Sequence, residues 1–371
     1  MRRWTVIFSI LFCGACSGGS GAQDSVSGLS FDIQSEGPFR VGYRTWEVTY
    51  THAGNPEGRT VPVHVWYPTE DRHDLRGEPP TEYPIYIDLF TDGETIIDAT
   101  PAVSIYEAGY PVVAYSHGAR GIAEGSYRLM GYFASHGWLG VSVGHVGDRL
   151  IDAESDSRQP LSHWIDRPMD VRAGLDALEN LDASNALHGL VNTQRVLLTG
   201  HSRGTYTSWA GAGSIYDIEA LRERCESGGY GETCTDELVG LFEDGFSDDR
   251  VVAIMPTAGN GHGEFFDGID GRADVGLPVF MMSASLDEVG AASVFDTLPL
   301  ADFSWVDIEG GCHELFNIGC GRSEDSAKFH IVTSYALAFG RKTVLGDTNS
   351  ETLAILDGTT QISEAATFVA K

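Results

Sequence analysis

A serine between two glycines is the feature of this sequence that most strongly indicates chemistry. Ser202 lies in Gly200-His-Ser-Arg-Gly204, directly after the apolar run Arg195–Thr199, which predicts a strand, and before a segment that predicts a helix. Flanking glycines let the backbone turn sharply, so that strand and helix present one hydroxyl at the carboxyl end of a sheet. The pattern therefore predicts a nucleophilic serine rather than a solvated serine in a tight turn.

A serine hydroxyl needs a base within hydrogen-bond reach and an acid that orients that base. Asp287 follows the predicted strand Leu277–Ser283, and His313 follows another predicted strand. Because Ser, Asp, His is the chain order that α/β-hydrolases use, we expect Asp287 as the acid and His313 as the base. The competing candidates are Glu288, Asp296 and Asp302 for the acid, and His262 and His330 for the base.

Two backbone N–H groups should stabilise the negative oxygen that forms when the serine attacks a carbonyl. One is expected on Arg203, the residue after the nucleophile. The other is expected in the glycine-containing loop 116–121, which leaves the predicted strand Pro111–Tyr115, and we choose Ala119. His117 is expected to brace this loop rather than to react.

Strand-like and helix-like segments alternate along most of the chain, which predicts parallel βαβ units in an α/β fold with a mostly parallel central sheet. An antiparallel pair is expected first, at Thr45–His52 and Thr60–Tyr67. Further strands are expected at Pro111–Tyr115, Leu139–Val143, Arg195–Thr199, Arg250–Met255, Leu277–Ser283 and Ser304–Ile308. Helices are expected near Tyr127–His136, over Asp170–Leu181 and near Ser326–Phe339.

We expect one catalytic domain over about residues 40–345, because no second segment carries a core of its own. The stretch 212–249 is rich in glycine and acidic residues and interrupts the alternation. It predicts an insertion over the edge of the sheet. Residues 346–371 are expected to form a C-terminal tail.

Four cysteines follow the N-terminal segment and allow three disulfide pairings: Cys225, Cys234, Cys312 and Cys320. An oxidising compartment favours disulfides, and pairing nearest neighbours, 225 with 234 and 312 with 320, closes the shortest loops. A zinc site is the competing interpretation, but neither pair has the short Cys-x₂₋₄-Cys spacing. We therefore expect two disulfides and no metal.

The first residues are typical of a bacterial export signal. Arg2 and Arg3 precede the apolar run Trp4–Phe12, which is too short for a membrane-spanning helix of about 20 residues. Cys13-Gly-Ala-Cys16 resembles a lipobox, which would lipidate Cys16 and attach the protein to a membrane through the tether 17–21. Cleavage near Ala22 is the alternative. We expect a periplasmic or cell-surface lipoprotein, or otherwise a secreted protein.

The 371-residue chain is strongly acidic, with 24 Lys and Arg against 53 Asp and Glu and a formal net charge of −29. No stretch concentrates basic residues. This charge balance argues against a nucleic-acid partner or binding to anionic lipid through charge.

Several stretches, in one order over about residues 40–345, resemble a known family. They are Arg59-Thr-Val-Pro-Val-His-Val-Trp-Tyr-Pro68, Ser116-His-Gly118, Arg167-Pro-Met-Asp170-Val-Arg-Ala-Gly-Leu-Asp176, Gly200-His-Ser-Arg-Gly204 and Asp249-Arg-Val-Val-Ala253. They resemble the α/β-hydrolases grouped with platelet-activating-factor acetylhydrolase and the dienelactone-hydrolase-like secreted esterases. Many members carry a second glycine after the serine turn, where this sequence has Thr205. The segment 212–249 is also particular to this chain.

The resemblance implies an α/β-hydrolase fold and ester hydrolysis, with Ser202, Asp287 and His313 as the triad. It also implies Ala119 and Arg203 as the oxyanion donors. We therefore expect an exported serine ester hydrolase that acts on small or lipid-like esters through an acyl-enzyme and needs no cofactor. An amidase or peptidase with the same triad, and a catalytically silent binding protein of this fold, are the alternatives.

Overall fold

A ten-stranded sheet forms the centre of the computed structural model, which describes residues 28–72, 83–85, 90–152, 160–230, 234–262, 265–266, 270–321 and 325–371. The strand order is β12-β11-β10-β9-β8-β6-β7-β2-β1-β5. The strands are β1 (Arg40–His52), β2 (Asn55–Thr69), β5 (Ile96–Ile97), β6 (Tyr110–Ser116), β7 (Leu139–Val143), β8 (Val191–His201), β9 (Val251–Thr257), β10 (Val279–Ala284), β11 (Phe303–Ile308) and β12 (Ala366–Ala370). Two short strands, β3 (Tyr83–Ile85) and β4 (Phe90–Asp92), pair with each other.

Parallel pairing prevails in the sheet, as the alternation of segments predicts. The strands from β7 through β6, β8, β9 and β10 to β11 run parallel. The antiparallel pairs are β1 with β2, β2 with β7, and β11 with β12. The opening antiparallel pair expected from the sequence is confirmed. The carboxyl ends of the parallel strands therefore share one edge of the sheet, where this class of fold places its ligands.

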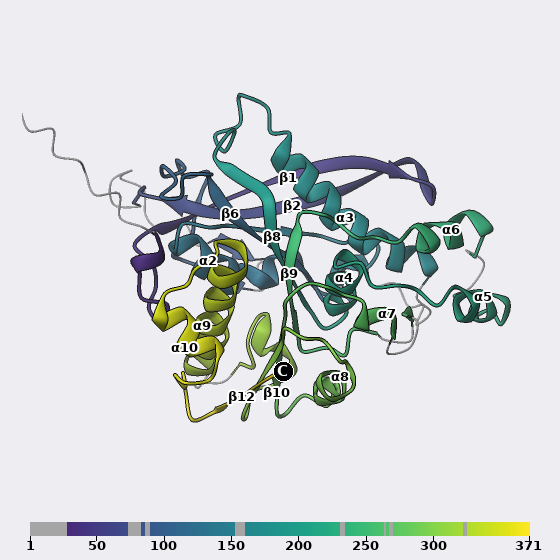
Figure 1. The fold of residues 1–371 in the computed structure, drawn as a ribbon. Helices are drawn as coiled ribbons and strands as arrows, with labels where there is room; N and C mark the ends of the chain where they lie inside the picture. The colour runs from purple at the N-terminus through teal and green to yellow at the C-terminus, as the bar shows by residue number, and fades with distance from the viewer. Residues whose placement is uncertain are drawn as a thin grey trace, which may run out of the picture.

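Helices cover both faces of the sheet (Figure 1). α2 (Tyr127–Ser135) and α9 (Asp325–Val344) pack on one face, and α3 (Leu161–Glu179) and α4 (Gly204–Gly211) pack on the other. Side chains alternate along each strand, so both faces are apolar. In β6, Val112 and Ala114 join the core beneath α3 and α4, whereas Val113 and Tyr115 join the core beneath α2 and α9.

The α3 helix begins at Leu161, earlier than the expected start at Asp170. Pro168 lies inside this helix and has no N–H to donate to the carbonyl of Trp164. The hydroxyl of Tyr206, from α4, donates to that carbonyl instead at 2.9 Å. A tertiary contact therefore compensates for the proline. This explains why the local sequence predicts a helix that starts later than the one observed.

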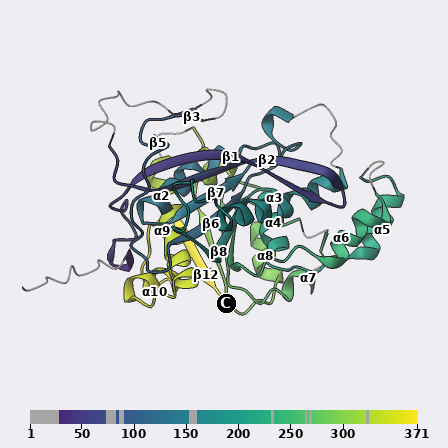
Figure 2. The same ribbon diagram turned by 90° about the horizontal axis from the view of Figure 1, so that it is seen from above.

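The segment 212–249 forms α5 (Ile218–Glu226) and α6 (Asp236–Asp244), joined by the Cys225–Cys234 disulfide. The expectation that it covers the edge of the sheet is wrong, because it packs on the helix layer. α6 contacts α3, and Figure 2 shows α5 and α6 on the side of α3 and α4, away from α9 and α10. Aromatic contacts explain this placement: Tyr216 packs edge-to-face on Phe242 of α6, with 5.0 Å between ring centroids, and shares a hydrogen bond with Tyr206 of α4.

Residues 346–371 do not form a tail outside the domain. They form α10 (Ser350–Leu356), which packs on α9, and β12, which extends the sheet beside β11. A five-residue edge strand gives a weak sequence signal, because only one side of it pairs and its side chains are partly exposed. The structure also describes two short α-helices, α7 (Asp270–Ala273) and α8 (Ala291–Thr297).

The expected signal peptide, the lipobox with Cys16 and the tether fall within residues 1–27, outside the described residues. Among the residues that are described, no helix is both long and apolar enough to cross a membrane.

Candidate active site

The chain reverses direction at Ser202, between β8 and α4. Ser202 has φ +54°, in the left-handed region that residues other than glycine rarely adopt. A Cβ at Gly200 would lie 2.1 Å from the carbonyl oxygen of Gly204, and a Cβ at Gly204 would lie 1.9 Å from the carbonyl oxygen of Ser116. Both glycines are therefore steric requirements of the turn. The turn itself is the strand–serine–helix junction that the sequence predicts.

Thr205 stabilises this turn from the first residues of α4. Its hydroxyl donates to the carbonyl oxygen of Ser202 at 2.6 Å and accepts the N–H of Gly261 at 3.1 Å. The side chain that departs from the resembled family thus holds the backbone of Ser202 to the loop after β9.

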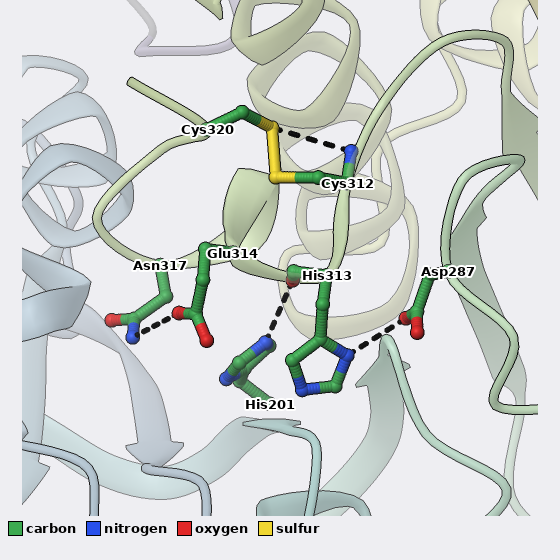
Figure 3. Close-up of a disulfide and its surroundings, with 7 residues drawn as sticks. All are labelled: His201, Asp287, Cys312, His313, Glu314, Asn317 and Cys320. Atoms are coloured by element: carbon green, nitrogen blue, oxygen red, sulfur yellow. Dashed lines mark hydrogen bonds and ion pairs between the residues drawn. A yellow bond between two sulfur atoms is a disulfide. The ribbon is translucent and has the colours of Figure 1, made fainter.

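His313 and Asp287 meet at the carboxyl edge of the sheet (Figure 3). His313 begins the short 3₁₀ helix His313–Phe316 after β11, and Asp287 follows β10. The Nδ1 atom of His313 donates to the Asp287 carboxylate at 2.9 Å. The side chain of Asp287 is 5% exposed and that of His313 is 33% exposed, so the acid is shielded and the imidazole reaches solvent. An acid that orients a partly open imidazole is the arrangement a general base requires.

The competing acids lie elsewhere. Glu288, Asp296 and Asp302 are exposed, and in the described part of the chain none of them bonds to His313. Of the competing bases, His262 contacts the ring of Trp164 and His330 lies on α9.

His201 connects the serine turn to the loop that carries His313. Its Nε2 atom donates to the carbonyl oxygen of His313 at 2.9 Å, and the two imidazole centroids are 4.6 Å apart. Ser202 follows His201 directly, so this contact brings the serine turn and the His313 loop together (Figure 3). Among the described residues, no hydrogen bond joins the Ser202 hydroxyl to His313. Catalytic hydrogen bonds often tighten only when substrate is bound.

A second Ser–His–Asp chain of hydrogen-bonded side chains is complete, but it is sealed from solvent. Ser116 Oγ lies 2.8 Å from His145 Nε2, and His145 Nδ1 lies 3.0 Å from the Asp170 carboxylate. Ser116 and Asp170 have no exposed surface and His145 is 1% exposed, so no substrate reaches them. The sequence analysis did not find this chain. Its members are structural, and they connect β6, the segment after β7 and α3.

The two expected oxyanion donors lie on either side of the serine turn, Arg203 directly after Ser202 and Ala119 in a turn that packs against it. Within the described residues, the backbone N–H groups of Ala119 and Arg203 have no hydrogen-bond partner. Ala119 lies in a turn closed by a hydrogen bond from the N–H of Gly121 to the carbonyl of Gly118 at 3.1 Å. A Cβ at Gly118 would lie 3.1 Å from the Cβ of Ser202, so this turn packs against the serine. Two unused donors beside one hydroxyl match what an oxyanion hole requires.

His117 braces the Ala119 turn, as expected from the sequence. It is fully buried and accepts the N–H of His145 on Nε2 at 3.0 Å. Its Nδ1 atom donates to the carbonyl of Gly118 at 2.8 Å. Both ring nitrogens are occupied, so the imidazole is not available as a base.

Three possible metal ligands, His313 among them, lie close together. His201, His313 and Glu314 each offer one atom within 4.8 Å of the others. One nitrogen of each imidazole is already in a hydrogen bond, and Asn317 donates to the Glu314 carboxylate at 3.0 Å. These contacts account for the orientation of the three side chains.

Among the buried histidines, four favour the neutral imidazole most strongly, with burial as the largest cause at each position. Burial lowers the pKa values of His136 and His201 to about 4. It also holds the pKa values of His117 and His145 well below the ordinary histidine value.

These histidines should make the folded protein sensitive to acid. In the unfolded chain a histidine gains its proton near pH 6.5, whereas in the folded chain these four stay neutral to a lower pH. Between about pH 6.5 and 4 the unfolded state binds more protons, so the free energy of unfolding falls as the pH falls. The loss is up to about 1.4 kcal/mol per pH unit for each histidine. Urea unfolding should show a lower midpoint at about pH 5 than at about pH 7.5, and equal midpoints would contradict this.

The two expected disulfides are confirmed as Cys225–Cys234 and Cys312–Cys320. The second adjoins His313, and the N–H of Cys312 also donates to the sulfur of Cys320 at 3.2 Å (Figure 3). This bridge closes the loop that carries His313.

Replacing Cys312 and Cys320 with alanine should therefore lower both stability and turnover. We expect a loss of about 2–3 kcal/mol in the free energy of unfolding, and a kcat about 10-fold lower because the base is less well positioned. The matched control is the double alanine variant of Cys225 and Cys234, a bridge of similar span, which should lose comparable stability and keep its kcat. Equal kcat losses in both variants would show that the bridge beside His313 has no special role.

Comparison with known proteins supports the fold. No protein-family profile matches this sequence, and no curated protein matches it. Among solved structures, the chain is similar to a ferulic acid esterase from Streptomyces cinnamoneus, with a TM-score of 0.59 and 19% identity. The likeness covers 89% of this chain and 96% of that chain. Together with the sheet order and the serine turn, it shows that the chain has the α/β-hydrolase fold.

Proposed function

We propose that the protein is an exported serine ester hydrolase with Ser202, Asp287 and His313 as its catalytic triad. The observation that carries the proposal is the 2.9 Å hydrogen bond from His313 to Asp287 at the edge of the sheet where the left-handed turn presents Ser202. The α/β-hydrolase fold supports it, as do the N–H groups of Ala119 and Arg203, which have no partner among the described residues. The similarity to a ferulic acid esterase favours an ester as the substrate.

In the proposed mechanism, His313 takes the proton of the Ser202 hydroxyl as the serine oxygen attacks an ester carbonyl. Asp287 accepts the Nδ1–H of His313 and keeps the imidazole in the tautomer whose Nε2 accepts a proton. The N–H groups of Ala119 and Arg203 stabilise the oxyanion. The alcohol leaves with the proton from His313, and water then hydrolyses the acyl-enzyme by the same route. None of these steps requires a cofactor or a metal.

The substrate class we propose is a small-molecule or lipid-like ester. Membership of the platelet-activating-factor acetylhydrolase and dienelactone-hydrolase-like group is part of the proposal and depends on the sequence motifs. Export is part of it as well: two disulfides favour an oxidising compartment, and the N-terminal residues are typical of a signal. A lipid on Cys16 would hold the enzyme at a membrane surface.

The test combines labelling with a substrate series. A fluorophosphonate probe should label the purified protein, because it reacts with an activated serine. Turnover of p-nitrophenyl esters from acetyl to dodecanoyl should define the acyl preference, and these esters should react faster than the matched p-nitroanilides. Faster anilide cleavage would instead indicate an amidase or peptidase. A protein that is neither labelled nor active on any ester would be a silent binding protein.

A further inference from the structure

The two proposed oxyanion donors belong to separate segments of the chain. The Arg203 N–H lies at the start of α4, and the Ala119 N–H lies in the turn after β6. An oxyanion hole works only when both N–H groups lie about 2.7–3.1 Å from one oxygen position. Some contact must therefore fix the distance between the two segments.

The carboxylate of Asp148, in the segment after β7, contacts both segments. Its Oδ2 atom accepts from the Arg203 guanidinium at 2.8 Å, so it reaches the residue whose own N–H is one donor. Its Oδ1 atom accepts the backbone N–H of Arg120 at 3.2 Å, directly after Ala119. One carboxylate thus links the start of α4 to the far side of the Ala119 turn.

Arg167 of α3 extends this link to the near side of the same turn. Its Nε and NH2 atoms donate to Asp148 Oδ2 at 3.0 and 2.7 Å. The same guanidinium donates to the carbonyl of His117 at 2.6 Å and to that of Gly118 at 3.0 Å, the two residues before Ala119. The Arg167 side chain is 1% exposed and that of Asp148 is 6% exposed, so solvent screens these contacts little.

We propose that Asp148 is a positioning residue that sets the spacing between the Ala119 and Arg203 N–H groups. It touches neither of these N–H groups and acts through the Arg203 and Arg167 side chains and the Arg120 backbone. The inference rests on the proposed function, because an oxyanion hole has meaning only in an acyl-transfer enzyme.

The charge balance of this cluster explains why a neutral side chain should not replace Asp148. Burial alone would raise the pKa of Asp148, but Arg167 and Arg203 outweigh it and hold that pKa well below the ordinary value. The carboxylate is therefore charged throughout the working pH range. Without it, two buried guanidinium groups repel each other, and the start of α4 and the Ala119 turn lose their common anchor.

The chain offers a matched control in Asp248. Asp248 also accepts two side-chain bonds from one arginine, Arg250, at 2.9 and 2.7 Å, and the backbone N–H of Arg250 at 3.0 Å. Its side chain is 11% exposed. β8 and β9 are parallel, and Asp248 precedes β9 whereas Ser202 follows β8. The control therefore lies at the opposite edge of the sheet from the serine turn.

The experiment compares Asp148→Asn with Asp248→Asn in the full chain. With a p-nitrophenyl ester, Asp148→Asn should lower kcat about 30- to 100-fold and leave KM within about 2-fold, because oxyanion contacts form only in the transition state. A trifluoromethyl ketone, which forms an oxyanion on the serine, should bind more weakly by a similar factor. Asp248→Asn should change kcat and the ketone affinity by less than about 2-fold.

A purely structural role would give a different result. Unchanged kcat in Asp148→Asn, or equal kcat losses in both variants, overturns the inference and leaves the proposed function intact. If Asp148→Asn does not fold, Arg203→Met decides the question, since it keeps the Arg203 N–H and the Asp148–Arg167 pair. This variant should lose at least about 10-fold in kcat with an unchanged KM, and wild-type kcat in it overturns the inference. An inactive and unlabelled wild-type protein overturns both proposals.

Discussion

Replacing Ser202 with alanine should lower kcat for a p-nitrophenyl ester by at least about 10³ and abolish labelling by a fluorophosphonate. The substitution removes the oxygen that forms the acyl-enzyme, while the oxyanion donors and the rest of the site remain. Stability should change little, because in the described residues the Ser202 hydroxyl makes no hydrogen bond. The backbone strain at this position should also be similar, because alanine has to adopt the same left-handed conformation that Ser202 adopts at φ +54°.

The control for this prediction is Ser116→Ala, in the sealed Ser116–His145–Asp170 chain. Ser116 Oγ lies within hydrogen-bond distance of His145 and donates to Thr207 at 2.9 Å, so its loss leaves buried polar atoms unpaired. This variant should lose about 1–3 kcal/mol in the free energy of unfolding and keep its fluorophosphonate labelling. Labelling that survives in Ser202→Ala but is lost in Ser116→Ala would reverse the assignment of the nucleophile.

Replacing Asp287 with asparagine should lower kcat by about 10³–10⁴. The amide keeps the size of the side chain but offers His313 either an N–H or an oxygen, so the imidazole no longer holds one tautomer. It also loses the negative charge that stabilises the imidazolium formed during the reaction. Steady-state kinetics on a p-nitrophenyl ester, with circular dichroism to verify folding, measures the effect.

Asp307→Asn is the matched control for Asp287. Asp307 lies on β11 and accepts a hydrogen bond from the Ser283 hydroxyl at 2.6 Å, and within the described part of the chain no hydrogen bond or ion pair joins it to His313. This variant should keep kcat within a few-fold of the wild-type value. A kcat in Asp287→Asn that is equally unaffected would show that His313 needs no acid partner, and the triad proposal would then be wrong.

If both predictions hold, solvent access is the property that distinguishes the catalytic Ser–His–Asp chain from the inactive one. The sealed chain has the more complete set of hydrogen bonds, from serine through histidine to the acid, yet its members have almost no exposed surface. The proposed triad has a histidine whose side chain is one-third exposed, and this histidine has a nitrogen left for the serine or the substrate. Hydrogen-bond geometry alone would select the wrong serine, whereas solvent access selects Ser202, because Ser116 also ends a parallel strand at the carboxyl edge but is fully buried.

The sequence alone was sufficient to predict the features that depend on contacts between residues close together in the chain or on regular patterns along it. The serine turn could be predicted because glycines at 200 and 204 are required by contacts within the turn and with the strand beside it. The parallel sheet could be predicted because apolar runs alternate with helical segments, and the disulfides because short loops close most easily. The candidate acid and base could be proposed because each follows a strand whose end lies at the same edge.

Only the tertiary structure decided which distant groups meet. Asp287 rather than Glu288, Asp296 or Asp302 faces His313 because of how the loops after β10 and β11 lie side by side. The Asp148 cluster joins residues from four separate segments and leaves no local pattern in the sequence. The same holds for Tyr206, which compensates for Pro168, and for β12, which extends the sheet. Periodicity and turn chemistry act over a few residues, whereas buried charge pairs and edge strands depend on the packing of the whole chain.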